Sequence, residues 1–418
     1  MLGPPQRVYY GWFVASAAAA TEFANAASAI SILTIFVIPM GEEFGWSRTE
    51  ISGATSLGAI FGAALAPISG MIVDRLGSRL VLALGGLVVA GACFYLASAQ
   101  TLIGFYIAFT FARTADQGLI KIGTSPVVAK WFRRYRGRAI AMVFFGGALG
   151  IIILAPVVQL VISTWGWRAA WVMLGGVMLV LGVLPSALVI RRQPEDLGLM
   201  VDGAQIDQAV IGDTPTSSSQ DLPPPDGEAE WPLRYVLRMP SFWLLLLSLF
   251  AVSTASAGVI LHLVPYLTEQ GLSSRSAVTI ISVFSASGAA ATLAVGFISE
   301  RTSPRLLMFL GYLLAATAMG VLVITDNLAK AYLFAVLQGA AASWINVLAP
   351  ILLASYYGRQ SMGSVFGIVR AGQVIGFALG ALIAGVVYDS TGSYENAFIL
   401  FVVIAMASSL LILLARRP

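Results

Sequence analysis

Twelve apolar stretches recur along the chain, and each is long enough to cross a lipid bilayer. They cover residues 11–39, 47–73, 80–99, 102–129, 138–163, 168–190, 240–267, 276–298, 306–325, 329–356, 362–388 and 395–415. A transmembrane helix needs about 20 apolar residues to cross a hydrocarbon core of about 30 Å. Inside that core the backbone must satisfy its own hydrogen bonds, which favours helices. The pattern therefore predicts an all-α membrane protein with twelve transmembrane helices.

The composition agrees with a surface that faces lipid. Hydrophobic residues make up 58% of the chain and charged residues 11%, whereas a soluble domain holds about 25% charged residues. Cys93 is the one cysteine and His262 the one histidine, which excludes a disulfide framework and a cluster of thiolate or imidazole metal ligands. We see no nucleophile with a partner base and no cofactor loop, so we expect no enzyme activity, no metal and no cofactor.

The basic residues predict the orientation. Most of them fall between spans on the side that holds the N-terminus, among them Arg7, Arg75, Arg79, Lys130, Arg133, Arg134, Arg136, Arg138, Arg191, Arg192, Arg301, Arg305 and Arg359. The opposite side receives Arg48, Arg168, Arg275 and Lys330. The positive-inside rule then places both termini in the cytoplasm of a plasma or bacterial inner membrane. The net charge of +4 follows from this topology, so we expect the lipid bilayer and no nucleic acid as a partner.

A polar segment divides the twelve stretches into two sets of six. It is rich in acidic residues, proline and serine, as linkers are. We therefore expect an N-terminal bundle at 1–190, a cytoplasmic linker at 191–238 and a C-terminal bundle at 239–418.

The two halves also repeat each other. GMIVDRLGSR at 70–79 aligns with GFISERTSPR at 296–305 at an offset of 226 residues, and the same register pairs Gly166 with Gly392. A duplicated set of six spans is a transporter architecture, in which two bundles rock around a site near the membrane midplane.

The motif at 70–79 resembles the signature loop between helices 2 and 3 of the major facilitator superfamily. Its matching residues are Gly70, Asp74, Arg75, Gly77 and Arg79. Four further phrases resemble the monocarboxylate porter and oxalate/formate antiporter branch of that superfamily: YYGWFV, KWFRRYRGRAIAMVFFGGALG, HLVPYLTEQGLS and RRQPEDLG. The resemblance implies the superfamily fold of two pseudo-symmetric six-helix bundles, and a monomer.

The motif has a mechanical interpretation. We expect the Asp74 carboxylate to cap and pair across the two bundles on the cytoplasmic side, with Arg75 and Arg79 available to flanking carbonyls or carboxylates. The repeat keeps Glu300 and Arg301 at the matching positions, which favours a gate. The alternative is a basic anchor in a tight turn.

The fourth span carries charges where lipid would penalise them. Arg113 lies about 18 Å below the outer end of this helix, where a charge facing lipid costs about 2.5 kcal/mol or more. Arg113, Gln117 and Lys121 are spaced i, i+4 and i+8, so we expect them on one face that points into the bundle. Asp116 is close enough to pair with Arg113. Lys121 has the alternative of reaching out to the cytoplasm.

Arg370 is the cation that we expect to bind substrate. The charges inside the spans are Arg113, Lys121 and Arg370 against Glu22 and Asp116, an excess of one positive charge. Arg370 has no acidic neighbour within helical reach, and its planar guanidinium matches a carboxylate. Oxalate/formate antiporters carry a cation in a similar place on helix 11. The alternative is a structural pair of Arg370 with Glu22 or Asp116. Four polar residues are expected to complete the site: Gln117, Asn25, Asn346 and Gln373.

Glu22, His262 and Asp116 are the candidates for proton coupling, in that order. An apolar wall would favour the neutral form of Glu22, and histidine titrates near neutral pH. A hydrogen-bonded histidine at a helix end is the alternative for His262.

Together these features predict a secondary transporter that moves a small organic monocarboxylate, such as lactate or pyruvate, with a proton by alternating access. The partners would be a small organic anion and a proton. The eighth span lacks the arginine that is typical of the branch, which argues against a dicarboxylate. The alternatives are an anion exchanger of the oxalate/formate type, an exporter of an amphipathic metabolite or drug, and a sensor without transport.

Overall fold

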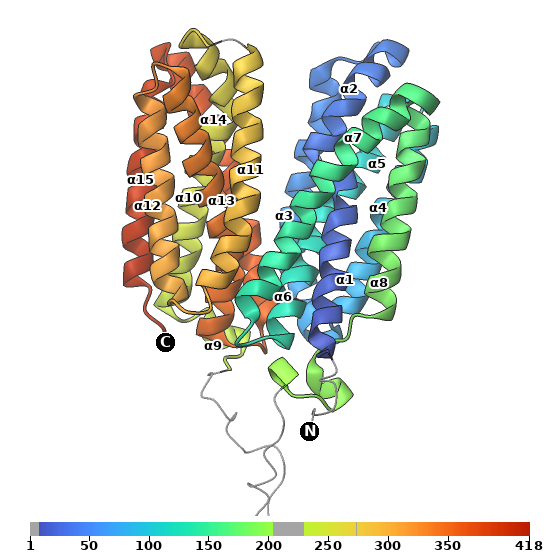
Figure 1. Ribbon diagram of the computed structural model, residues 1–418, viewed down its shortest axis with the longest axis vertical. Helices are drawn as coiled ribbons and strands as arrows, with labels where there is room; N and C mark the ends of the chain where they lie inside the picture. The colour runs from blue at the N-terminus through green and yellow to red at the C-terminus, as the bar shows by residue number, and fades with distance from the viewer. Residues whose placement is uncertain (1–7, 204–229, 273) are drawn as a thin grey trace, which may run out of the picture.

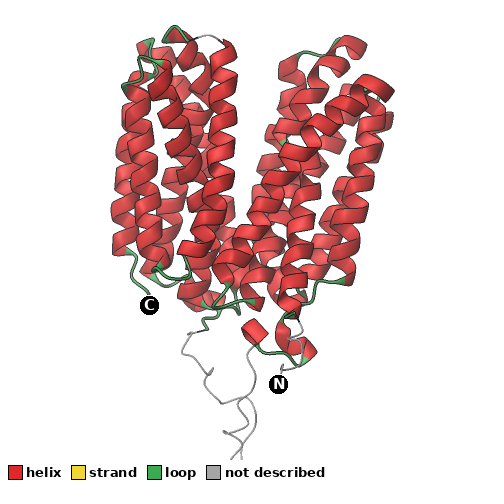
Figure 2. Cartoon of the chain, viewed as in Figure 1, coloured by secondary structure: helices red, strands yellow, loops and turns green. Residues whose placement is uncertain are grey.

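The computed structural model describes residues 8–203, 230–272 and 274–418, and these residues form helices and loops without any strand (Figure 2). Two helical bundles stand side by side. The N-terminal bundle runs from blue to green and the C-terminal bundle from yellow to red, and both ends of the chain lie at the same end of the molecule (Figure 1). We call this end the terminal side and the other end the far side.

The helices follow the order of the predicted spans. The N-terminal bundle contains α1 (Tyr10–Asn25), α2 (Ile30–Phe44), α3 (Arg48–Leu76), α4 (Ser78–Ser98), α5 (Leu102–Ala115), α6 (Lys121–Trp131), α7 (Arg136–Val177) and α8 (Leu184–Leu188). The C-terminal bundle contains α10 (Pro240–Glu269), α11 (Ser274–Ile298), α12 (Pro304–Val323), α13 (Leu328–Tyr357), α14 (Met362–Thr391) and α15 (Glu395–Leu414), preceded by the short α9 (Leu233–Val236).

These helices make the twelve spans that the apolar pattern predicts. Ten stretches are long and apolar enough to cross a membrane, and one of them extends over 53 residues, Arg136–Leu188. Gly166, with φ of 83°, breaks that stretch into two spans. The remaining span is α5 with α6, which contains Arg113, Asp116 and Lys121 and is therefore too charged to resemble an ordinary membrane helix. The first span is α1 and α2, joined by a 3₁₀ turn at Ala26–Ser28.

Local signals in the sequence fix where helices begin. Ser47 accepts a hydrogen bond from the Glu50 backbone, and the Glu50 side chain accepts one from the Ser47 backbone, so this pair forms a capping box at the start of α3. Thr101 caps α5 and Asn327 caps α13 in the same one-sided way. These caps satisfy backbone N–H groups that a helix leaves free.

The two bundles meet at the terminal side and diverge toward the far side (Figure 1). At the meeting point α3 packs on α14 and α7 packs on α11. A side chain at Gly70 would collide with the Gly363 carbonyl, and one at Gly137 would collide with the Gly296 carbonyl. Glycine is required at these crossings because backbone atoms of the two bundles touch.

The described beginning of the predicted linker is anchored to the N-terminal bundle. The Asp202 carboxylate accepts hydrogen bonds from the backbone N–H groups of Arg133 (3.0 Å) and Arg134 (2.7 Å), just before α7. The middle of that linker, residues 204–229, lies outside the described residues.

Candidate functional site

The charged span is interrupted by a wider turn. Residues Asp116–Ile120 form a π-helical turn between α5 and α6. Such a turn inserts about one extra residue and rotates the side chains that follow by about 100°. The expectation that Arg113, Gln117 and Lys121 share one face is therefore wrong, and the structure gives each of them a different partner.

Asp116 is the centre of the first charged cluster. Its carboxylate accepts hydrogen bonds from Arg113 Nη1 (2.5 Å), Asn25 Nδ2 (2.7 Å) and Gln117 Nε2 (2.7 Å). The Asp116 side chain is 4% exposed. Three donors, one of them a cation, compensate the loss of water around this carboxylate. The pair of Arg113 with Asp116 that the spacing predicts is present.

Glu22 and Lys121 form the second ion pair. Lys121 Nζ donates to Glu22 Oε2, and Thr124 Oγ1 donates to Glu22 Oε1 at 2.8 Å. Glu22 therefore does not lie in an apolar wall, and Lys121 does not reach out to the cytoplasm. The expectation for both residues is wrong because α1 and α6 are adjacent in the bundle, which no local pattern indicates.

Arg370 is the remaining central cation. It lies on α14 and donates to Gln117 Oε1 (3.1 Å) across the bundle interface and to Gln373 Oε1 (3.5 Å) on its own helix. Its Nε is buried without a hydrogen-bond partner. Asp116 and Glu22 act on it electrostatically, but in the described ranges it forms no ion pair with either. The five central charges thus resolve into two ion pairs and one guanidinium held by amides.

Two predicted residues are not part of this cluster. His262 bonds through its two ring nitrogens to Tyr394 Oη and the Ala381 carbonyl, each at 3.2 Å, within the C-terminal bundle. Asn346 donates to the carbonyl of Ala342 on its own helix at 2.9 Å. Their predicted roles in proton coupling and in substrate binding have no geometric link to Arg370 in this state.

Asp74 joins the two bundles at the terminal side. Its carboxylate accepts hydrogen bonds from the backbone N–H groups of Gly363 (2.8 Å) and Ser364 (2.7 Å), from Ser364 Oγ (2.7 Å) and from Lys130 Nζ (3.2 Å). The carboxylate thus lies at the N-terminus of α14, where the helix dipole favours a negative charge.

Glu300 makes the matching contact from the other bundle. It accepts from Arg138 Nε (2.9 Å to each carboxylate oxygen) and from the Arg138 backbone N–H (3.2 Å) at the start of α7. Arg138 and Ser364 are 226 residues apart, as are Asp74 and Glu300. The contacts therefore obey the internal repeat.

The remaining motif residues behave differently from the prediction. Arg75, Arg79 and Arg301 are exposed, and none of them makes a hydrogen bond or ion pair in the described part of the chain. Arg192 instead donates to the Asp74 carbonyl at 2.9 Å, and Gly77 supplies a positive φ of 85° between α3 and α4. Sequence reasoning missed Lys130 and Ser364 as partners of Asp74, because the side chains that meet a motif depend on how the bundles dock.

Comparison with known proteins agrees with this architecture. The model of the Major Facilitator Superfamily matches residues 18–336 and 328–418. The chain is 26% identical over 412 residues to mouse monocarboxylate transporter 11, covering 95% of this chain and 85% of that protein. It is 25% identical over 356 residues to zebrafish monocarboxylate transporter 12-B, covering 83% and 75%. The oxalate:formate antiporter of Oxalobacter formigenes is 23% identical over 381 residues, covering 90% and 85%.

Two solved structures share the fold. The E. coli fucose:proton symporter FucP, described in the outward conformation, superposes with a TM-score of 0.73 at 13% identity, covering 98% of this chain and 100% of that one. The human organic anion transporter MFSD10 gives 0.70 at 15% identity, covering 98% and 100%. The chain therefore belongs to the Major Facilitator Superfamily, as a multi-pass membrane transporter related to monocarboxylate transporters and to an oxalate:formate antiporter.

Proposed function

We propose that the protein moves a small organic monocarboxylate together with a proton by alternating access, and that Arg370 binds the substrate carboxylate. The observation that carries this proposal is that Arg370 has no ion pair at the centre of the molecule, whereas Arg113 and Lys121 have theirs. A substrate carboxylate would replace the weaker amide acceptor Gln117 and gain a charge-assisted hydrogen bond.

The charge count favours a monocarboxylate over a dicarboxylate. Two ion pairs are neutral, and the one remaining cation is neutralised by one carboxylate. A second carboxylate would need a second unpaired cation, and α11 supplies no arginine or lysine along its span from 276 to 298. An unmatched charge at the centre of a membrane protein is costly, so the second carboxylate would be excluded.

Glu22 is our first choice for the proton, ahead of His262 and Asp116. Asp116 accepts from three donors that favour its ionised form. Glu22 accepts from Lys121 and Thr124, and the Lys121 side chain is 28% exposed, so water has access to the ion pair. Protonation of Glu22 in the same cycle as anion binding to Arg370 would keep the transported complex electrically neutral.

The state described here would be the one that receives substrate from the far side. The Asp74 and Glu300 contacts hold the two bundles together at the terminal side, and the bundles diverge toward the far side (Figure 1). We take the terminal side as cytoplasmic, because the basic residues gather there. Transport would then require both contacts to break while the far side closes.

The test is uptake of radiolabelled lactate, pyruvate, formate and oxalate into proteoliposomes, with and without an inward proton gradient. The expected result is uptake of a monocarboxylate that the gradient stimulates and that Arg370→Gln abolishes. Arg370→Lys is the matched control, because it keeps the charge and loses the planar fork, and should retain part of the uptake.

Other outcomes would select other functions. Uptake that requires a preloaded counter-anion and ignores the gradient would identify an exchanger, like the antiporter among the relatives. Full activity of Arg370→Gln, or no uptake of any acid, would overturn the proposal and favour an exporter of amphipathic compounds.

A further inference from the structure

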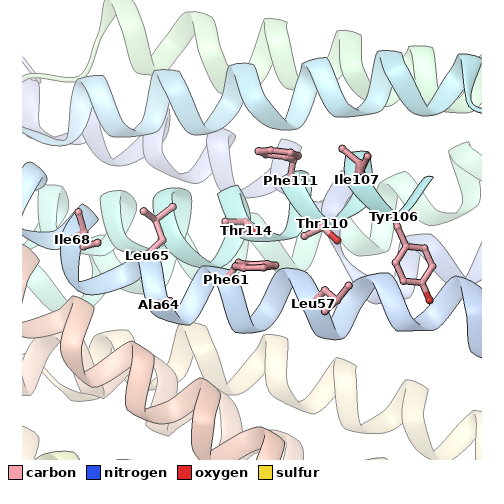
Figure 3. A pocket seen from close by; sticks show the side chains of 10 residues that line it. All are labelled: Leu57, Phe61, Ala64, Leu65, Ile68, Tyr106, Ile107, Thr110, Phe111 and Thr114. Carbon is pink, nitrogen blue, oxygen red and sulfur yellow. The ribbon is translucent and has the colours of Figure 1, made fainter. Parts of the chain in front are cut away.

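An apolar groove lies between α3 and α5, apart from the charged cluster (Figure 3). Its volume is about 660 Å³, within the range of about 300–1,000 Å³ that ligand pockets occupy. Apolar side chains dominate the lining, which consists of Leu57, Phe61, Ala64, Leu65, Ile68, Tyr106, Ile107, Thr110, Phe111 and Thr114. Both walls belong to membrane-spanning helices, so the medium around the groove is lipid.

The groove opens on the outer surface of the bundle. Phe61, Ile107 and Phe111 are 55%, 54% and 59% exposed, which is typical of side chains that face hydrocarbon. Other faces of α3 make the helix contacts: Gly58 packs on α5, and Gly70 packs on α14. The groove therefore does not belong to the interface between the bundles.

An unpaired arginine lies below the groove on the same face of α3. Arg75 follows Leu57 by 18 residues, which is five helical turns, so both side chains leave α3 in the same direction. Arg75 is about 10 Å along the helix from Ile68, the last lining residue. Its side chain is exposed and has no partner in the described ranges, and Arg79 at the start of α4 is also exposed and unpaired there.

We propose that this groove binds an acyl chain of an anionic phospholipid from the leaflet at the terminal side, with its phosphate on Arg75. The dimensions agree, because one leaflet contributes about 15 Å of the hydrocarbon core. A chain that starts near Arg75 therefore passes Ile68 and ends near Phe61. The cation selects an anionic headgroup over a neutral one, and basic residues near a membrane surface contribute this kind of selection.

The bound lipid would act on the segment that carries the charged cluster. Gly58 leaves no room for a side chain beside Cβ of Arg113, and Gly62 leaves none beside Cβ of Gln117. This tight contact of α3 with α5 forms the floor of the groove. A chain that fills the groove holds the two helices together, so we expect the lipid to raise the unfolding temperature.

The experiment compares phosphatidylglycerol with phosphatidylcholine added to the purified, delipidated protein. Bound lipids are counted by native mass spectrometry, and the apparent Tm is measured in parallel. We expect about fivefold more retained phosphatidylglycerol, as for one basic residue near an anionic headgroup, and a higher Tm with that lipid. Arg75→Gln should remove the preference, and Ala64→Trp should remove the bound lipid by filling the groove.

Two matched variants separate this site from general effects. Ile60→Trp adds the same bulk to another exposed position on α3, and Arg417→Gln removes an exposed arginine from the other bundle. Both should retain lipid as the wild type does. Equal retention of the two lipids by the wild type, or an unchanged preference in Arg75→Gln, would overturn the proposal. Arg75 is exposed, so that variant remains informative if Ala64→Trp fails to fold.

Discussion

Asp74 in the N-terminal half and Glu300 in the C-terminal half occupy matching positions, and each bonds to the start of a helix in the opposite bundle. The membrane interior of the two halves differs. The N-terminal bundle contains Glu22, Arg113, Asp116 and Lys121 as two ion pairs, whereas the C-terminal bundle contributes Arg370. The duplicated gate is symmetric, and the central charge is not.

This difference assigns separate tasks to the two halves. A rocking motion needs equivalent contacts on both bundles, so selection for the motion preserves the repeat. Binding an anion needs one uncompensated cation at the interface, and a symmetric pair of such cations would repel. Gln117 is the described side chain that connects the two interiors, because it bonds to Asp116 on one side and Arg370 on the other.

The largest expected effect comes from removing the unpaired cation. Arg370→Gln should lower uptake at subsaturating substrate by about 100-fold, because a desolvated charged contact is worth about 2–5 kcal/mol. The same variant should leave the apparent Tm unchanged or raise it, since no ion pair is broken. A large fall in Tm with this variant would show that Arg370 is structural.

Breaking an ion pair should give the opposite result for stability. Asp116→Asn removes the negative charge that Arg113 contacts, and unpairing a buried ion costs about 3 kcal/mol. The apparent Tm in detergent should therefore fall. The double variant Arg113→Met with Asp116→Leu should recover part of the loss, because it removes both charges. An unchanged Tm in Asp116→Asn would contradict the described pairing.

The gate variant should change turnover more than binding. Asp74→Asn keeps the shape but loses the charge that four donors share, and charge-assisted hydrogen bonds are worth about 1.5–3 kcal/mol each. We expect Vmax of uptake to fall by about 30-fold with little change in KM. Unchanged transport at saturating substrate would argue against a gating role.

Proton coupling is tested by Glu22→Gln. A gradient of one pH unit is worth about 1.4 kcal/mol per proton, which corresponds to tenfold accumulation. The variant should lose this stimulation and retain exchange of labelled for unlabelled substrate, because exchange requires no net proton movement. A pH profile identical to that of the wild type would remove Glu22 from the mechanism and leave His262 and Asp116 as the remaining candidates.

The smallest effect is expected at the second gate. Glu300 bonds to Arg138, whose side chain is 36% exposed, and exposed ion pairs contribute about 1 kcal/mol or less. Glu300→Gln should therefore slow turnover by about fivefold at most, compared with about 30-fold for Asp74→Asn. Equal losses in the two variants would indicate that the gate is energetically symmetric as well.

The sequence alone determined the architecture of this protein. Span length, the charged linker, the repeat at 226 residues and the motif at 70–79 predicted twelve helices in two bundles, because membrane helices are specified by local hydrophobicity over about 20 residues. The spacing of Arg113 and Asp116 likewise predicted their ion pair, since both lie within one turn.

The tertiary structure alone decided which charges remain unpaired. Lys121 reaches Glu22 on α1, Lys130 reaches Asp74 on α3, and the π turn at Asp116–Ile120 rotates the residues after it. These contacts depend on distances between helices that are far apart in the chain and on one extra residue in a helical turn. Periodicity is a local property, so it identifies charged residues inside a membrane without identifying their partners across the bundle.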